Sequence, residues 1–175
     1  MTQFRIFLLL LTLFAHPLLG SEKSSLFTVD MGKLFRSSDF GKNVILINNI
    51  ARQSLQNENE ELELELLSEE KALSELRKTL SLDEFRPKAI KFDEKVSIIR
   101  TEQGKKEENL NNKARQEESE FYKAIYPLLY ELLLDRGGLV LIDQRNVILW
   151  DSSVDITDAA IELINQSLGK SIKSD

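Results

Sequence analysis

The chain has 175 residues, of which 42% are hydrophobic and 30% are charged, and its formal net charge is −6. This length suits one domain, or one small domain that carries an extended appendage. The hydrophobic fraction indicates a folded core, while the charged fraction excludes an integral membrane protein. The acidic balance argues against a nucleic-acid partner, because such a partner requires a basic face.

Residues 1–20 have the layout of a secretory signal peptide. Arg5 precedes an apolar run at residues 6–14, in which Thr12 is the only polar residue, and Pro17 and Gly20 follow it. The run is shorter than the roughly 20 residues that a helix needs to span a bilayer. We therefore expect export and cleavage near Gly20, with an uncleaved anchor as the alternative.

Cleavage of this segment would limit the chemistry of the mature chain. His16, the only histidine, lies in the segment, and the sequence contains no cysteine. Without an imidazole base or a thiol nucleophile, we expect no enzyme, no catalytic residue, no metal site and no cofactor. An exported chain without disulfides must gain its stability from burial, either within the chain or between subunits.

Residues 21–38 are expected to form the N-terminal part of a small folded body. Within them, the segment "LFTVD" at residues 26–30 predicts a strand, and a short helical turn follows through Leu34 and Phe35.

Residues 39–120 predict a coiled-coil arm whose tip lies near residues 79–88. Glu, Lys, Leu, Gln and Asn dominate this stretch, which is typical of long helices. The apolar positions of an a/d heptad frame in its first half are Leu55, Leu62, Leu66, Leu73, Leu76 and Leu80. One stripe of this helix therefore requires a partner helix.

The heptad frame stops at Ser81. Because Ser81 is followed by Glu84 at capping-box spacing, we expect one helix to end near Thr79 and another to start at Leu82. Pro87 should kink the second helix locally. The matching apolar positions of the second helix are Ala89, Phe92, Val96, Ile99 and Leu110. Two long helices joined by a tight turn form an antiparallel hairpin.

The returning helix has a weak stretch between residues 100 and 120. Its poor helix formers are Gly104, Asn109, Asn111 and Asn112. We predict a soft spot with fast amide exchange in this stretch. The alternative is that these positions are merely exposed.

Charges of opposite sign lie on the two helices. Residues 58–70 contain seven glutamates and no basic residue. The basic residues expected to face them are Lys95, Arg100, Lys105 and Lys106. Each exposed pair would contribute only about 0–1 kcal/mol, so these charges would set the register rather than the stability of the hairpin. A solvated charged face explains much of the same pattern.

Residues 121–175 are expected to contain a helix, a β-hairpin and a last helix. The first helix places Tyr122, Tyr126 and Tyr130 on one face, and Phe121, Ile125, Leu128 and Leu132 on another, with Leu129, Leu133 and Leu134 between them. A helix that is apolar nearly all round must be buried on more than one side. We interpret the three tyrosines as part of the hydrophobic core, and a ligand-binding role is the alternative. Gly137 and Gly138 end this helix.

Two apolar runs then predict strands at 139–142 and 147–150, with Asn146 in a left-handed turn between them. Both faces of the hairpin should be covered, because neither run alternates with polar residues. Asp155 and Asp158 are expected to cap the last helix, which runs to Leu168.

Four aspartates near the ends of these strands offer the strongest case for a metal or catalytic site, namely Asp143, Asp151, Asp155 and Asp158. Their spacing lacks the glycine of a calcium-binding loop, so we interpret them as strand-end and capping residues. The fold class is therefore α+β, in which terminal strands form a small β-body and a helical hairpin is inserted between them.

Two segments resemble a known family, the OmpH/Skp periplasmic chaperones. They read "LFTVDMGKLFRSS" at residues 26–38 and "GGLVLIDQRNVILWDSSVDITDAAIELI" at residues 137–164, and long heptad helices lie between them. The resemblance implies a homotrimer whose strands form one β-body and whose three arms enclose a cavity. It also implies a periplasmic location and the holding of unfolded outer-membrane proteins without ATP.

The resemblance gives the apolar strands the role of joining the trimer. The oligomerisation residues that follow from it are Leu26, Phe27, Val29, Leu139, Val140, Leu141, Ile142, Val147, Ile148, Leu149 and Trp150. No client-contact residue can be carried over, because the family has no short binding motif. The acidic charge argues against anionic lipid or lipopolysaccharide as a partner. A structural coiled-coil spacer or adaptor of the cell envelope, without clients, is the alternative function.

Overall fold

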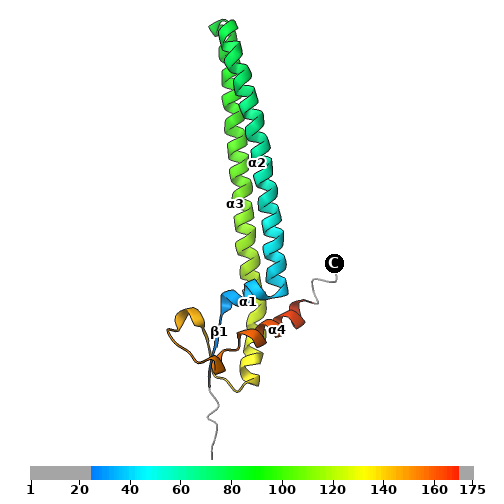
Figure 1. Ribbon diagram of the computed structural model, residues 1–175, viewed down its shortest axis with the longest axis vertical. Helices are drawn as coiled ribbons and strands as arrows, with labels where there is room; N and C mark the ends of the chain where they lie inside the picture. Colours follow the sequence, from blue (N-terminus) through cyan, green and yellow to red (C-terminus); the bar gives the residue numbers. More distant parts are fainter. Residues whose placement is uncertain (1–24, 170–175) are drawn as a thin grey trace, which may run out of the picture.

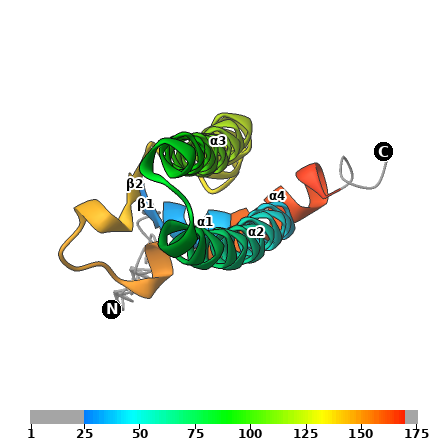
Figure 2. The ribbon, with the colours of Figure 1, turned by 90° about the horizontal axis from the view of Figure 1, so that it is seen from above.

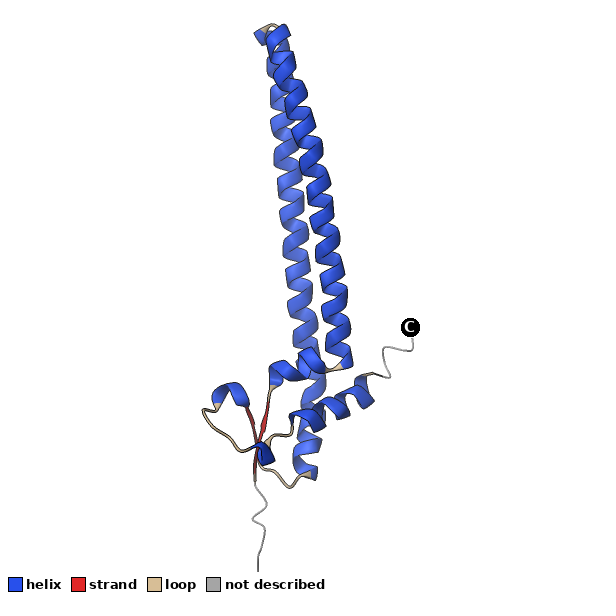
Figure 3. Ribbon diagram, in the orientation of Figure 1, coloured by secondary structure: helices blue, strands red, loops and turns tan. Residues whose placement is uncertain are grey.

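The computed structural model describes residues 25–169, so the signal peptide expected at residues 1–20 lies outside the described part. Its elements are β1 (Leu26–Val29), α1 (Met31–Ser37), α2 (Asp39–Thr79), α3 (Leu82–Asp135), β2 (Val140–Asp143), the 3₁₀ turns η1 (Gln144–Asn146) and η2 (Ser152–Val154), and α4 (Thr157–Leu168). Figure 1 shows α2 and most of α3 as a long arm that rises from a small body. Almost everything described is helical, apart from two short strands (Figure 3).

The arm is the antiparallel hairpin that the sequence predicts. The 41 residues of α2 span about 60 Å at 1.5 Å per residue. At the tip, the Glu84 carboxylate accepts hydrogen bonds from the backbone N–H of Ser81 at 3.1 Å and from its hydroxyl at 2.6 Å. This capping box confirms the predicted turn.

The returning helix α3 is continuous from the tip to the body. It runs through Pro87 and through the weak stretch at 100–120 without a break. Its length of 54 residues makes it part of both the arm and the body. A continuous helix does not report local stability, so the soft spot stays a prediction.

The two strands pair in parallel, although they are more than a hundred residues apart in the sequence. Leu26 lies opposite Val140, and Val29 lies opposite Asp143. The arm is thus inserted into a sheet that both ends of the chain build. The structure is mostly helical, with two terminal parallel strands, and this arrangement agrees with the predicted fold class.

The predicted β-hairpin is wrong within the single chain. β2 is followed by the turn η1, and residues 147–150 form an irregular loop rather than a strand. The Asp143 carboxylate accepts a hydrogen bond from the backbone N–H of Arg145 at 3.0 Å, which starts a 3₁₀ turn in place of a tight hairpin turn. The predicted left-handed conformation of Asn146 is also wrong, because no residue other than glycine has a positive φ in the described chain.

The core of the body lies between α1, α3, α4 and β1. The Phe121 ring is its centre, with the Phe35 ring 5.2 Å away edge-on and the Phe40 ring 5.6 Å away in a stack. The buried side chains of α3 are Phe121, Ile125, Leu129 and Leu133. Leu128 and Leu132, which we expected on this face, are only partly buried because the buried residues follow a spacing of four.

The start of α4 departs in one detail from the predicted capping. The Asp155 carboxylate accepts a hydrogen bond from the backbone N–H of Thr157 at 2.9 Å, as a capping residue would. Asp158, by contrast, forms an ion pair with Lys33 of α1 at 2.7 Å. Only Asp155 therefore serves the turn that starts α4, and Asp158 links α4 to α1.

Candidate functional site

The four aspartates do not form a site. Asp143, Asp151 and Asp155 each accept a hydrogen bond from the backbone N–H two residues ahead, at 3.0, 2.8 and 2.9 Å. Hydrogen bonds from Arg145 hold the pKa of Asp143 below its usual value, and those from Ser153 do the same for Asp151. Across residues 25–169, no three acidic or histidine side chains come together as a metal site. The carboxylates of Asp143, Asp151 and Asp155 shape turns, as the sequence indicates, whereas Asp158 pairs with Lys33.

The most prominent surface feature of the body is an apolar loop, residues 147–150, which we call the exposed loop. Ile148 is 94% exposed and Leu149 is 86% exposed. Figures 1 and 2 show the segment after β2 projecting sideways from the body. Burial of such a side chain is worth about 1.5–3 kcal/mol, so the loop stabilises the protein only when a partner covers it.

The predicted oligomerisation residues divide into two groups. Those exposed on the protomer are Leu26, Leu139, Val140, Ile148, Leu149 and Trp150. Phe27 and Val29 are buried in the core of the protomer itself, and Leu141, Ile142 and Val147 are half-buried. The exposed group contains the side chains that a second chain could reach.

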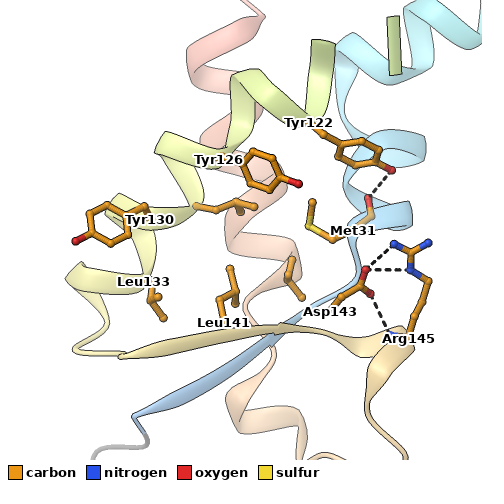
Figure 4. A pocket seen from close by; sticks show the side chains of 10 residues that line it. Met31, Tyr122, Tyr126, Tyr130, Leu133, Leu141, Asp143 and Arg145 are labelled. Carbon is orange, nitrogen blue, oxygen red and sulfur yellow. Dashed lines mark hydrogen bonds and ion pairs between the residues drawn. The ribbon is translucent and has the colours of Figure 1, made fainter. Parts of the chain in front are cut away.

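A pocket of about 440 Å³ lies between the last turns of α3 and strand β2. Tyr122, Tyr126 and Tyr130 line its α3 side, and Leu141 lines its strand side, so we call it the tyrosine pocket (Figure 4). Tyr126 and Tyr130 are 59% and 62% exposed. The sequence shows the tyrosine stripe, but it does not show that the stripe faces an open pocket rather than the core.

Polar groups close two parts of the rim of this pocket. The Asp143 carboxylate binds the Arg145 guanidinium at 2.6 and 2.9 Å. The Tyr122 hydroxyl donates a hydrogen bond to the Glu118 carboxylate at 3.2 Å, and burial raises the pKa of this phenol. Because Tyr122 and Arg145 are held in place, the pocket has a fixed wall at one end and exposed rings at the other.

Ion pairs across the arm confirm half of the predicted charge pairing. Lys95 binds Glu65 at 2.9 Å and Glu69 at 2.6 Å, and Lys106 binds Glu58. The other two predicted basic residues, Arg100 and Lys105, form no such pair with the described residues. The pairs that do form connect α3 to α2 across the arm.

The arm also presents apolar side chains to solvent. Leu46, Ile47 and Ile50 lie near its base, and Leu64 and Ile98 lie near its middle, each about half exposed or more. None of the helices described here is long and apolar enough to cross a membrane.

The comparisons with known proteins agree with this architecture. A family model described as "Outer membrane protein (OmpH-like)" matches residues 25–164. A solved structure from Caulobacter crescentus CB15, described as an OmpH-like outer membrane chaperone, matches with a TM-score of 0.76 and 20% identity over 82% of this chain and 85% of that chain. No curated protein sequence matches. The family resemblance of the sequence is thus confirmed, and the chain belongs to the OmpH-like family.

Proposed function

We propose that the protein is an ATP-independent holdase chaperone of the periplasm, which binds unfolded outer-membrane proteins and prevents their aggregation. The observation that carries this proposal is the long arm with exposed apolar side chains, inserted into a body with an uncovered apolar loop. The family match supports the general class, a chaperone of outer-membrane proteins.

The arm suits clients of this kind. An outer-membrane β-barrel protein in transit exposes strand edges and an apolar outer band, and both promote aggregation. Side chains such as Leu64 and Ile98 offer isolated apolar contacts on a surface that is otherwise charged and hydrated. Several weak contacts can hold an unfolded chain without folding it, and release then needs no chemical energy.

The body suits a homotrimer. The exposed loop and the neighbouring Leu139 and Val140 form an apolar surface that one protomer leaves open to water. In a trimer this surface would be buried, and three arms would rise around a shared cavity in which the client lies. The N-terminal segment at 1–20 would direct export to the periplasm and be removed near Gly20.

Native mass spectrometry of residues 21–175 tests these proposals together. The chain is measured alone and after mixing with a urea-unfolded outer-membrane β-barrel protein diluted into buffer. We expect a trimer that captures one unfolded chain and keeps it soluble. A trimer that ignores the client would favour a structural spacer, and a monomer or dimer would overturn the proposed assembly.

A further inference from the structure

The body of one protomer carries two apolar features that nothing in the described chain matches. One is the exposed loop, whose Ile148 and Leu149 side chains stand almost fully in water. The other is the tyrosine pocket, an open cavity of about 440 Å³. Because the exposed loop projects from the body and the tyrosine pocket is concave, the two surfaces could be complementary.

The loop is held away from the pocket of its own chain. The Asp143–Arg145 pair starts η1 where β2 ends, and the backbone N–H of Val147 bonds the Gln144 carbonyl at 3.1 Å. A second turn at Asp151 fixes the other end of the loop, because its carboxylate accepts from the backbone N–H of Ser153 at 2.8 Å. Figures 1 and 2 show the segment between these turns projecting from the body on the side away from α3.

The chemistry of the two features is complementary. The pocket offers the faces of Tyr126 and Tyr130 beside the aliphatic Leu141, and the loop offers one aromatic and two aliphatic side chains that are exposed, namely Trp150, Ile148 and Leu149. Tyrosine and tryptophan are favoured at the centres of interfaces, because each buries a large apolar ring and keeps one polar group. The Trp150 indole N–H can donate a hydrogen bond, and the exposed tyrosine hydroxyls can accept one.

We propose that the tyrosine pocket of each protomer receives Ile148, Leu149 and Trp150 from the exposed loop of a neighbouring copy. Because the two surfaces differ, each contact is head-to-tail, and a suitable rotation closes such contacts into a ring. A ring of three copies places one loop in every pocket and leaves neither feature open. This inference rests on the homotrimer proposed above and names the surfaces that form it.

The absence of cysteine from the chain allows a direct test by cross-linking. The variant Tyr126→Cys/Leu149→Cys is prepared in the chain of residues 21–175 and oxidised under native conditions. We expect covalent dimers and trimers on a denaturing gel, since one sulfur lies in a pocket and the other in the loop that fills it. Each single variant is a control for random cross-linking. Leu64→Cys/Leu149→Cys is the matched control, because Leu64 is similarly exposed but lies on the arm.

Native mass spectrometry of the same samples before oxidation tests the homotrimer separately from the loop-in-pocket contact. A trimer whose double variant cross-links no more than the controls overturns the loop-in-pocket contact and leaves the trimer intact. A disulfide within single chains overturns it as well, because the loop would then fill its own pocket. A protein that is monomeric before oxidation overturns the homotrimer, and the present inference fails with it.

Fluorescence provides an independent check, since Trp150 is the only tryptophan. The variant Tyr126→Lys should shift the emission maximum to longer wavelength and dissociate the trimer, while the far-ultraviolet circular dichroism keeps its helical signal. Leu64→Lys should change neither the emission nor the mass. Unchanged emission and an unchanged trimer in Tyr126→Lys would contradict the proposal.

Discussion

The Thr157 hydroxyl accepts a hydrogen bond from the backbone N–H of Asp30 at 2.9 Å, which joins two positions that are 127 residues apart in the sequence. Asp30 lies between β1 and α1, and Thr157 is the first residue of α4. The entire arm lies between them. Formation of the hairpin brings these distant segments close together, which lowers the entropic cost of closing the long loop between them.

We predict that Thr157→Val destabilises the body by about 1–3 kcal/mol. The substitution keeps the shape of a side chain that is 1% exposed, but it leaves the Asp30 N–H without its partner and removes one of the two hydrogen bonds from Thr157 to the Asp155 carboxylate. The midpoint of urea unfolding at fixed protein concentration measures the effect. Thr101→Val on the exposed arm is the matched control and should change stability by less than about 0.5 kcal/mol. Equal midpoints for the two variants would show that this link is unimportant.

We predict that Ile148→Asp dissociates the assembly without unfolding the protomer. Ile148 is 94% exposed in the single chain, so the protomer gains nothing from its side chain. In an interface, the change would lose about 1.5–3 kcal/mol of burial and would add the cost of desolvating a charge, so dissociation constants should rise more than tenfold. Analytical ultracentrifugation measures the mass, and circular dichroism measures the helix. Leu64→Asp is the control, and equal masses for both variants would argue against the loop as an assembly surface.

The arm could be predicted from the sequence because its determinants are local. Heptad spacing from Leu55 to Leu80 and the Ser81–Glu84 box involve residues only a few positions apart. The box forms as expected, and the predicted heptad leucines are half-buried except for Leu76, which is exposed. The body, by contrast, depends on contacts between segments that come before and after the arm in the sequence. No local pattern states that Leu26 pairs with Val140, or that the parallel partner of β2 precedes the arm.

The wrong predictions for residues 147–150 and for the tyrosine stripe also concern contacts that no local sequence pattern shows. The run at 147–150 is apolar enough for a strand, but within one chain it has no strand beside it, and the side chain of Asp143 turns the backbone before a hairpin can form. The interpretation of the tyrosine stripe as core is wrong for Tyr126 and Tyr130, which are exposed beside the pocket between α3 and β2. Segments that are distant in the sequence decide both cases.

We predict that Gln103→Leu stabilises the returning helix. Gln103 occupies the seam between Ile99 and Leu110, and its side-chain carbonyl oxygen is buried without a hydrogen-bond partner in the described chain. A buried acceptor without a partner destabilises the fold by about 1–3 kcal/mol, and leucine removes it. The only hydrogen bond lost is the one of 3.0 Å from Gln103 to Glu58, and Glu58 keeps Lys106 as its other partner. Slower amide exchange at residues 100–112 is the expected result.

The control for this substitution is Gln116→Leu, which changes an exposed glutamine of the same helix and should leave those rates unchanged. The wild-type rates also test the predicted soft spot, because uniformly slow exchange from 100 to 120 would rule it out. Faster exchange in Gln103→Leu than in wild type would show that the bond to Glu58 matters more than the unsatisfied oxygen.

We predict that the tip of the arm loosens in acid. Hydrogen bonds from the Ser81 hydroxyl and backbone N–H lower the pKa of Glu84 from its usual value of 4.5. A carboxyl whose pKa is lower in the folded state stabilises the fold above its unfolded pKa, and this contribution is lost as the pH falls through the folded pKa. Amide protection at Ser81 and Phe85, whose backbone N–H groups are hydrogen-bonded at this turn, should therefore decrease as the pH falls below about 4.5.

Amide exchange measured by NMR over a pH series, corrected for the intrinsic pH dependence of exchange, separates the tip from the rest of the arm. Glu84→Gln should give weaker protection at neutral pH and no loss on acidification, since its side chain does not titrate. Ser81→Ala should lower protection at neutral pH as well, because Glu84 then keeps only the backbone bond. If acid loosens the tip equally in wild type and in Glu84→Gln, the responsible carboxylate is not the one in the capping box.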